Sequence, residues 1–228
     1  MDSLRVLFNS PTAAAAVVQL APWASSPAAF NLEVALLREA QLESMDPPSN
    51  GLYTITATDC GDPYGPIGSI HPRAKKPVGD RLGGALLTHV YNTPTPYSGP
   101  RLTSVANGGG SASAAISATL SFSGVGAKGL LVISPSATGP YANSSVCPVG
   151  VSADLCMGMM LQGNSGKWYP AQATVTSDGS ELVLEVGSAA NGETRAMATA
   201  SGWSLWPITL LYSMDGMMPA FPWNASAK

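Results

Sequence analysis

The chain of 228 residues has few charged residues, only two histidines and no long apolar run. Charged residues make up 11% of the chain, and a formal net charge of −3 gives no broad cationic field for binding nucleic acid. No stretch approaches the roughly 20 unbroken apolar residues of a membrane span. Because 45% of the residues are hydrophobic, the chain can still bury a sizeable core. We therefore expect a folded protein that binds neither nucleic acid nor membrane.

Cysteine is also scarce. The three cysteines include no CxxC pair, so a structural zinc site has no ligand framework and we predict no metal site. Cys147 and Cys156 are close enough in sequence that they could bridge a short loop. Two acceptor sequons for N-linked glycans, Asn-Ser-Ser at 143–145 and Asn-Ala-Ser at 224–226, fit a secreted protein or one of the lysosome or another lumen. We expect such a localisation, although the N-terminal segment contains no convincing signal peptide.

The first 95 residues alternate between apolar segments and amphipathic ones. Residues 14–20 and 51–59 each predict a strand, and the first is of the continuous apolar kind typical of a buried parallel sheet. Residues 27–46 and 77–91 predict helices. The order strand, helix, strand, helix indicates an α/β unit. The predicted inner faces of the helices are formed by Phe30, Val34, Leu37 and Gln41, and by Val78, Leu82, Ala85, Leu86 and Val90.

The pattern changes after about residue 95. Beyond Arg101, short runs of strand-forming residues are separated by clusters of Gly, Asn, Asp and Ser, and Asp178-Gly179 is a typical hairpin signal. We place a boundary near residues 93–98. The predicted fold class is thus an α/β unit in residues 1–95, followed by an all-β, sandwich-like module in residues 96–228.

His71 lies on a Gly/Pro-rich loop between the second predicted strand and the second predicted helix. Loops at the carboxyl ends of parallel strands form the ligand crevice of α/β sheets, and an imidazole there can take a proton from a hydroxyl nucleophile. The structural alternative, favoured by the pattern alone, is that His71 caps the helix or bonds a backbone carbonyl. Asp59 and Asp62 could orient the ring, although carboxylates beside Pro and Gly are commonly turn formers. His89 falls within a helix, where we expect a structural role.

Four aromatic residues near the C-terminus allow two interpretations. They could form a platform on which a sugar ring stacks, or they could be buried in the core of the β module or where it packs against the α/β part. Ordinary residue statistics favour burial. The four residues are Trp203, Trp206, Tyr212 and Trp223.

The segment GSIHPRAKKPVGDRL at 68–82 resembles the histidine-containing block of the sialate O-acetylesterase family, a branch of the SGNH-type serine esterases. Upstream, VVQLAPW at 17–23 and LLREAQ at 36–41 are similar to the family's strand and helix. Downstream, YSGP, GKWYPAQATV, WSLWP and MMPAFPW resemble the family's C-terminal β module in the right order. The matching residues of the histidine block are Ile70, His71, Pro72, Lys75, Val78, Arg81 and Leu82.

This resemblance implies part of an SGNH, flavodoxin-like three-layer α/β domain followed by an accessory β module. It also implies a carboxylic ester hydrolase that removes O-acetyl groups from sialic acid or a related sugar through an acyl-serine intermediate, without a cofactor. His71 would be the general base, with Asp62 as the first candidate for its acid partner and Asp59 as the second. Arg38 and Gln41 recur in the family's helix and are predicted to contact the substrate.

In the family, the nucleophile lies in a Gly-Gln-Ser-Asn block that a Tyr-Gln-Gly-Glu-like block follows. Neither occurs in the 228 residues, and no G-x-S-x-G elbow replaces them. We therefore expect the chain to be inactive by itself and to act with an N-terminal chain that carries the nucleophile. Proteolytic division of a longer protein and an incomplete sequence would both explain the missing blocks. The alternative function is a non-catalytic glycan-binding or structural β module with a vestigial α/β remnant.

Overall fold

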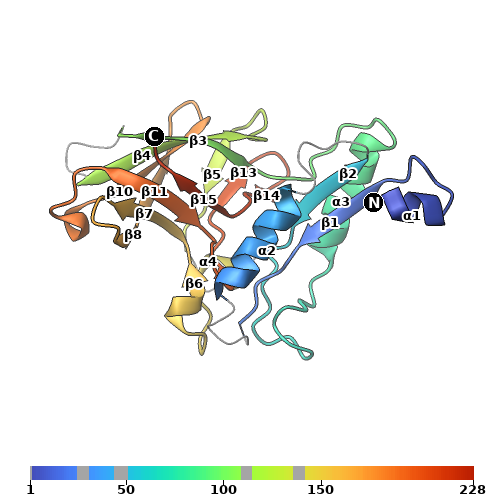
Figure 1. Cartoon of the computed structure of the whole chain (residues 1–228), viewed down its shortest axis with the longest axis horizontal. Coiled ribbons are helices and arrows are strands. Elements are labelled where there is room, and N and C mark those ends of the chain that lie inside the picture. The colour runs from blue at the N-terminus through green and yellow to red at the C-terminus, as the bar shows by residue number, and fades with distance from the viewer. Residues whose placement is uncertain (1, 25–30, 44–50, 109–114, 136–141) are drawn as a thin grey trace.

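The computed structural model describes residues 2–24, 31–43, 51–108, 115–135 and 142–228 (Figure 1). The protein is mostly β, with few helices and several separate sheets. Within the described residues, no helix combines the length and apolar character needed to cross a membrane.

The N-terminal part is built around two parallel strands. Its elements are α1 (Asp2–Leu7), β1 (Ala15–Gln19), α2 (Asn31–Glu43), β2 (Leu52–Thr56) and α3 (Lys76–His89). β1 and β2 pair in register from Ala15 opposite Leu52 to Gln19 opposite Thr56. Figure 1 shows α2 in front of the strands and α3 behind them. The predicted order of strand, helix, strand and helix is therefore correct for β1, α2, β2 and α3, as is the parallel pairing, whereas α1 was not predicted.

The buried face of α2 differs from the predicted one. Val34, Ala35 and Arg38 are buried, whereas Leu37, predicted to point inward, is 48% exposed. The helix is turned by about 100°, one residue, relative to the prediction, because the Arg38 side chain points inward and binds backbone carbonyls. Phe30, also predicted on the inner face, lies outside the described residues.

A similar correction applies to α3. Ala85 is buried as predicted, but Leu86 is 46% exposed and Val90 is exposed too, so their inward placement is wrong. The reason is again a buried arginine. Arg81 points into the protein, where it pairs with Asp59. The helix is therefore oriented with Arg81 inward, and Leu86 and Val90 of the predicted apolar face point outward.

The C-terminal part is formed mainly by antiparallel sheets, with one short parallel pair of strands, which confirms the predicted β-rich module. One sheet has the strand order β3 (Arg101–Asn107), β4 (Ile116–Ser123), β10 (Glu181–Val186) and β9 (Gln172–Val175). A second has the order β15 (Trp223–Ser226), β11 (Ala196–Ser201), β7 (Met159–Gly163) and β8 (Trp168–Pro170). A three-stranded sheet joins β14 (Met218–Pro219), β13 (Leu211–Ser213) and β5 (Leu130–Val132). The described residues between the strands include the single-turn helix α4 (Ala142–Ser145) and two 3-10 turns (Ala153–Leu155 and Ser188–Ala190).

One apolar core lies between the two larger sheets. Leu120, Leu182 and Leu184 come from the first sheet, and Leu161 and Trp223 come from the second. The hairpin signal at 178–179 is confirmed, because β9 and β10 pair on either side of it. Among the four aromatic residues, Trp206, Tyr212 and Trp223 are buried, as the packing interpretation predicted, and Trp223 belongs to this core.

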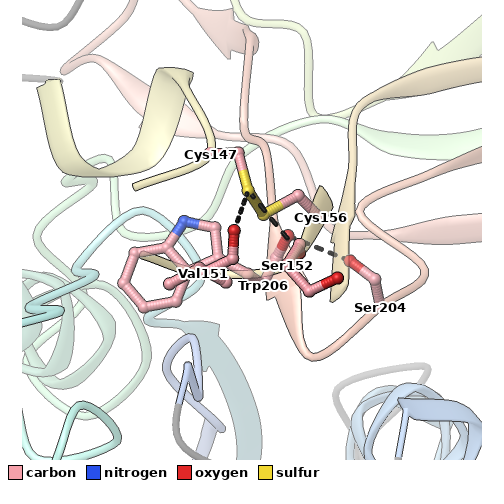
Figure 2. Close-up of a disulfide and its surroundings, with 6 residues drawn as sticks. All are labelled: Cys147, Val151, Ser152, Cys156, Ser204 and Trp206. Carbon is pink, nitrogen blue, oxygen red and sulfur yellow. Dashed lines mark hydrogen bonds between the residues drawn. A yellow bond between two sulfur atoms is a disulfide. The ribbon is translucent and has the colours of Figure 1, made fainter. Parts of the chain in front are cut away.

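A disulfide supports the contact between the two parts. Cys147 and Cys156 are bonded, as expected from the sequence (Figure 2). Cys156 begins β6 (Cys156–Met157), which pairs with β12 (Trp206–Pro207). Just before these strands, Leu155 and Leu205 form a small buried cluster with Val34 of α2. The disulfide loop therefore forms part of the surface against which α2 packs.

Candidate functional site

His71 lies in the loop that joins β2 to α3, on the side of the strand pair where β2 ends. The loop is a series of tight turns, in which the amides of Gly65, Gly68 and His71 each bond the carbonyl three residues earlier. Gly68 has φ +103°, a conformation that only glycine adopts without strain. These hydrogen-bonded turns fix the backbone that leads to His71, and the histidine itself is exposed. An accessible ring is what proton transfer to or from a bound molecule requires.

Asp62, at the start of this loop, is hydrogen-bonded to Arg73 at its end. Its two carboxylate oxygens accept from Arg73 Nε (2.7 Å) and Nη2 (2.9 Å), and Oδ2 also accepts from the Arg73 backbone amide (3.0 Å). These hydrogen bonds lower the pKa of Asp62 below its ordinary value. Asp62, the first candidate for the acid partner of His71, therefore ties together the two ends of the loop that carries the histidine. Among the described residues, no hydrogen bond joins the two side chains, so that role stays a prediction.

Ser69 fixes the loop to the segment that follows β1. Its side chain is buried, and Oγ accepts from the backbone amide of Ala24 at 2.7 Å. Because Ser69 is two residues before His71, this bond ties the histidine loop to the segment that follows β1. The loop that leaves β2 is therefore also attached to the chain that leaves β1.

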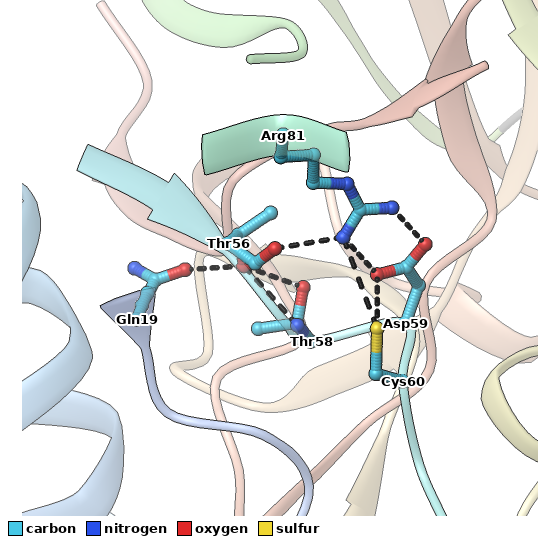
Figure 3. A network of polar contacts seen from close by, with 6 residues as sticks. All are labelled: Gln19, Thr56, Thr58, Asp59, Cys60 and Arg81. Atoms are coloured by element: carbon cyan, nitrogen blue, oxygen red, sulfur yellow. Dashed lines mark hydrogen bonds and ion pairs between the residues drawn. The ribbon is translucent and has the colours of Figure 1, made fainter. Parts of the chain in front are cut away.

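Beneath the loop, a buried polar network joins the ends of the two strands (Figure 3). Gln19 Oε1 accepts from Thr56 Oγ1 at 2.7 Å, and Thr56 Oγ1 lies 3.0 Å from Thr58 Oγ1. Arg81 of α3 binds Asp59 through both carboxylate oxygens (2.7 and 2.6 Å) and also donates to the Thr56 carbonyl. Asp59, the second candidate acid, is therefore held in a buried ion pair with Arg81.

Cys60 is a buried free thiol in the same network. Burial, reinforced by the negative charge of Asp59, raises its pKa to about 12. The thiol therefore stays protonated near neutral pH, and since the thiolate is the reactive form it is a poor nucleophile.

Arg38 and Gln41, the predicted substrate contacts, lie where α2 meets the segment after β1. Arg38 is fully buried, and its guanidinium donates to four carbonyl oxygens, two on each side of the contact between the two parts of the chain. Burial lowers the pKa of Arg38 to about 9. Gln41 Oε1 accepts from the Leu20 amide at 3.1 Å. These contacts are structural, and substrate binding by the two residues stays a prediction. The four carbonyls belong to Leu20, Ala21, Ser204 and Leu205.

His89 has the structural role expected from its helical position. Its ring stacks on Tyr53 with 4.1 Å between centroids, and Nε2 lies 2.7 Å from the Tyr97 hydroxyl. Burial lowers the pKa of His89, which favours the neutral ring. His89 thus anchors the segment after α3 against β2.

Sequence reasoning found the histidine but missed the framework that holds it. The ion pair between Asp59 and Arg81 and the buried Gln19 join residues far apart in the chain, and no local pattern signals them. Arg81 did appear in the histidine-block resemblance, which was the available hint. Within the described part of the chain, no group of three or more His, Cys, Asp or Glu side chains could hold a metal ion.

No family model of known proteins matches the chain, and no curated protein matches it. Among solved structures, the protein is similar to a carbohydrate acetylesterase from Xanthomonas citri, with 24% sequence identity and a TM-score of 0.70. The match covers 98% of this chain but only 44% of the acetylesterase. At this level of identity, the likeness shows a shared fold. The chain thus has the fold of less than half of that longer enzyme.

Proposed function

We propose that the chain is part of a sialate O-acetylesterase-like carbohydrate esterase, in which His71 acts as general base. The observation that carries this proposal is an exposed histidine, held at the carboxyl ends of two parallel strands by the Asp62–Arg73 closure and by Ser69. The fold shared with a carbohydrate acetylesterase supports it. The substrate would be an O-acetylated sialic acid or a related acetylated sugar.

The chemistry needs a hydroxyl nucleophile that we expect from polypeptide outside this chain. As the nucleophile's oxygen forms a bond to the acetyl carbon, His71 takes the hydroxyl proton. When the bond to the sugar oxygen breaks, the imidazolium returns that proton to the leaving sugar hydroxyl. Water then attacks the acetyl-enzyme, with His71 again as base, to release acetate and restore the nucleophile.

The surroundings of His71 fit an anionic sugar. Lys75 is exposed four residues after the histidine, and the Arg73 side chain is 65% exposed although it binds Asp62. We expect Lys75, and Arg73 to the extent that Asp62 does not offset its charge, to attract the carboxylate of a bound sialic acid. The disulfide and the exposed sequon at Asn224 support the proposal that the protein belongs to an oxidising, secretory compartment.

The proposal is tested by acetate release from O-acetylated sialic acid and from acetylated neutral sugars. The chain is mixed with the portion of the acetylesterase that lies outside the match, expressed as a separate polypeptide. We expect acetate release that His71→Ala abolishes and that Lys75→Ala, a change of an exposed neighbour, only weakens for the anionic sugar. Glycan binding without any acetate release would instead support the non-catalytic alternative.

A further inference from the structure

The parallel sheet of the N-terminal part ends at β1. Within the described residues, β1 pairs with β2 alone. All the β2 residues from Tyr53 to Thr56 are buried, whereas Ala16 of β1 is exposed and Val17 and Val18 are only partly buried. A strand of this continuous apolar composition is typical of the interior of a parallel sheet, not of its edge.

The hydrogen bonds of β1 show which of its backbone groups face outward. The Ala15 amide donates to the Gly51 carbonyl, and the Gln19 carbonyl accepts from the Ala57 amide, so these residues face β2. Because successive residues of a strand direct their N–H and C=O groups to opposite sides, the corresponding groups of Ala16 and Val18 point away from β2. They form an open edge that another strand can bond.

The helices on the two faces of the strand pair expose large apolar side chains (Figure 1). On α2 these are Leu32, Leu36 and Leu37, and on α3 they are Leu86 and Leu87. Just before β1, the adjoining residues Val6, Leu7 and Phe8 are exposed as well. In the described β part, by contrast, exposed large apolar side chains are isolated: Val149, Met197 and Met214. The exposed apolar surface is therefore concentrated on the two-stranded unit, as expected where another layer packs.

We propose that the outer edge of β1, with the exposed faces of α2 and α3, binds a complementary α/β polypeptide that adds a parallel strand beside β1. This inference rests on the proposed function. The polypeptide that binds at this edge would be the chain that brings the nucleophilic hydroxyl to His71. The acetylesterase of the same fold supplies the argument for this occupant, since 98% of the present chain matches only 44% of it. More than half of that enzyme is thus available to cover the open side.

A second copy of the chain fits the edge less well. A two-fold dimer through β1 would pair the two strands antiparallel. The loops that carry His71 would then lie at opposite ends of the joined sheet, and neither copy would complete the site of the other. A parallel strand from a different polypeptide instead ends beside His71.

The test measures binding, not activity. The full chain is titrated with the portion of the Xanthomonas citri acetylesterase outside the match, and complex formation is followed by calorimetry and light scattering. We expect a one-to-one complex. Ala16→Pro removes an outward amide while sparing the bonds to β2, and it should weaken binding by about tenfold or more. The amides of Ala16 and Val18 should become protected from hydrogen exchange in the wild-type complex.

A matched control is Ala173→Pro on β9, also an edge strand. Thr176 donates to Glu181, so by the same alternation the Ala173 amide points away from β10. This variant should bind like the wild type, and so should His71→Ala. The proposal is overturned if the acetylesterase portion does not bind, if Ala16→Pro binds unchanged while the control folds, or if the open edge forms a homodimer instead. Binding without acetate release would support the docking proposal and contradict the proposed esterase function.

Discussion

Asp62 and Arg73 are joined by two parallel hydrogen bonds, 2.7 and 2.9 Å long, that close the loop bearing His71. The pair contributes to the geometry of the candidate site, because it joins the two ends of the segment that carries His71. Ser69 provides another attachment, through the amide of Ala24. Removing the carboxylate should therefore disturb the position of His71 more than the overall stability.

The closure by Asp62 should persist in mild acid. Its pKa is lowered in the folded protein, chiefly by the hydrogen bond from Arg73, so its contribution is present above the ordinary pKa of an aspartate. That contribution is lost only as the pH falls through the lowered value. We expect amide exchange of Gly65, Gly68 and His71, corrected for its intrinsic pH dependence, to stay slow at pH 5 and to accelerate well below pH 4. In Asp62→Asn the exchange should be fast at both pH values; equal protection in the variant and the wild type would contradict this role.

The buried ion pair between Asp59 and Arg81 should matter for stability. Replacing one partner, as in Asp59→Ala, leaves a buried charge without compensation and should lower the free energy of unfolding by about 3–5 kcal/mol. The exposed pair of Lys76 with Asp80 provides the control, since Lys76→Ala should cost at most about 0.5 kcal/mol. Urea denaturation measures both. Similar small losses of unfolding free energy in the two variants would show that the buried pair does not stabilise the structure around the site.

Arg38 should be required for the two parts of the chain to remain packed together. In Arg38→Met, four carbonyl oxygens lose the donors of a buried guanidinium, although the Leu205 carbonyl keeps the Trp23 amide. A buried carbonyl that is left without a donor costs roughly 1–3 kcal/mol. We expect a large loss of stability and a separate, earlier melting of the N-terminal part in a calorimetric scan. Leu37→Met, one position earlier on the exposed side of α2, should melt like the wild type. A single, unshifted transition in Arg38→Met would count against the interface described here.

The disulfide and the buried thiol determine how many thiols should react in the native and in the unfolded chain. Without reductant, the native chain should show no reactive thiol, and the unfolded chain should show one, from Cys60. Replacing both Cys147 and Cys156 by serine should cost about 2–3 kcal/mol, since the loop they close is short. Ellman's reagent and denaturation curves measure the two effects. Three reactive thiols in the unfolded, unreduced chain would mean that the bond does not form.

The local patterns in the sequence were sufficient to predict the main elements. The strand, helix, strand, helix order and the hairpin at 178–179 follow from periodicity and turn residues, which act over a few positions. The helix faces were predicted less well, because Arg38 and Arg81 are buried although arginine is usually exposed. Their partners, the carbonyls after β1 and the carboxylate of Asp59, come from other segments. No rule based on hydrophobicity could place them inward.

The same limit applies to the candidate site. The position of His71 on an exposed loop could be predicted, because a Gly/Pro-rich segment between a strand and a helix lies at the surface. The partners of Asp62 and Asp59 could not, since both Arg73 and Arg81 follow the two carboxylates in the chain and the sequence does not say which pairs with which. Only the folded arrangement shows that both acids hold the framework around the histidine.

The most direct test of the central claim is hydrolysis of a chromogenic acetate ester, measured with wild-type chain and with His71→Ala. Each is assayed alone and with the complementary acetylesterase portion. We expect no His71-dependent hydrolysis by the chain alone and clear His71-dependent hydrolysis by the mixture. Turnover by the isolated chain that His71→Ala abolishes, or turnover by the mixture that His71→Ala leaves unchanged, would contradict this expectation.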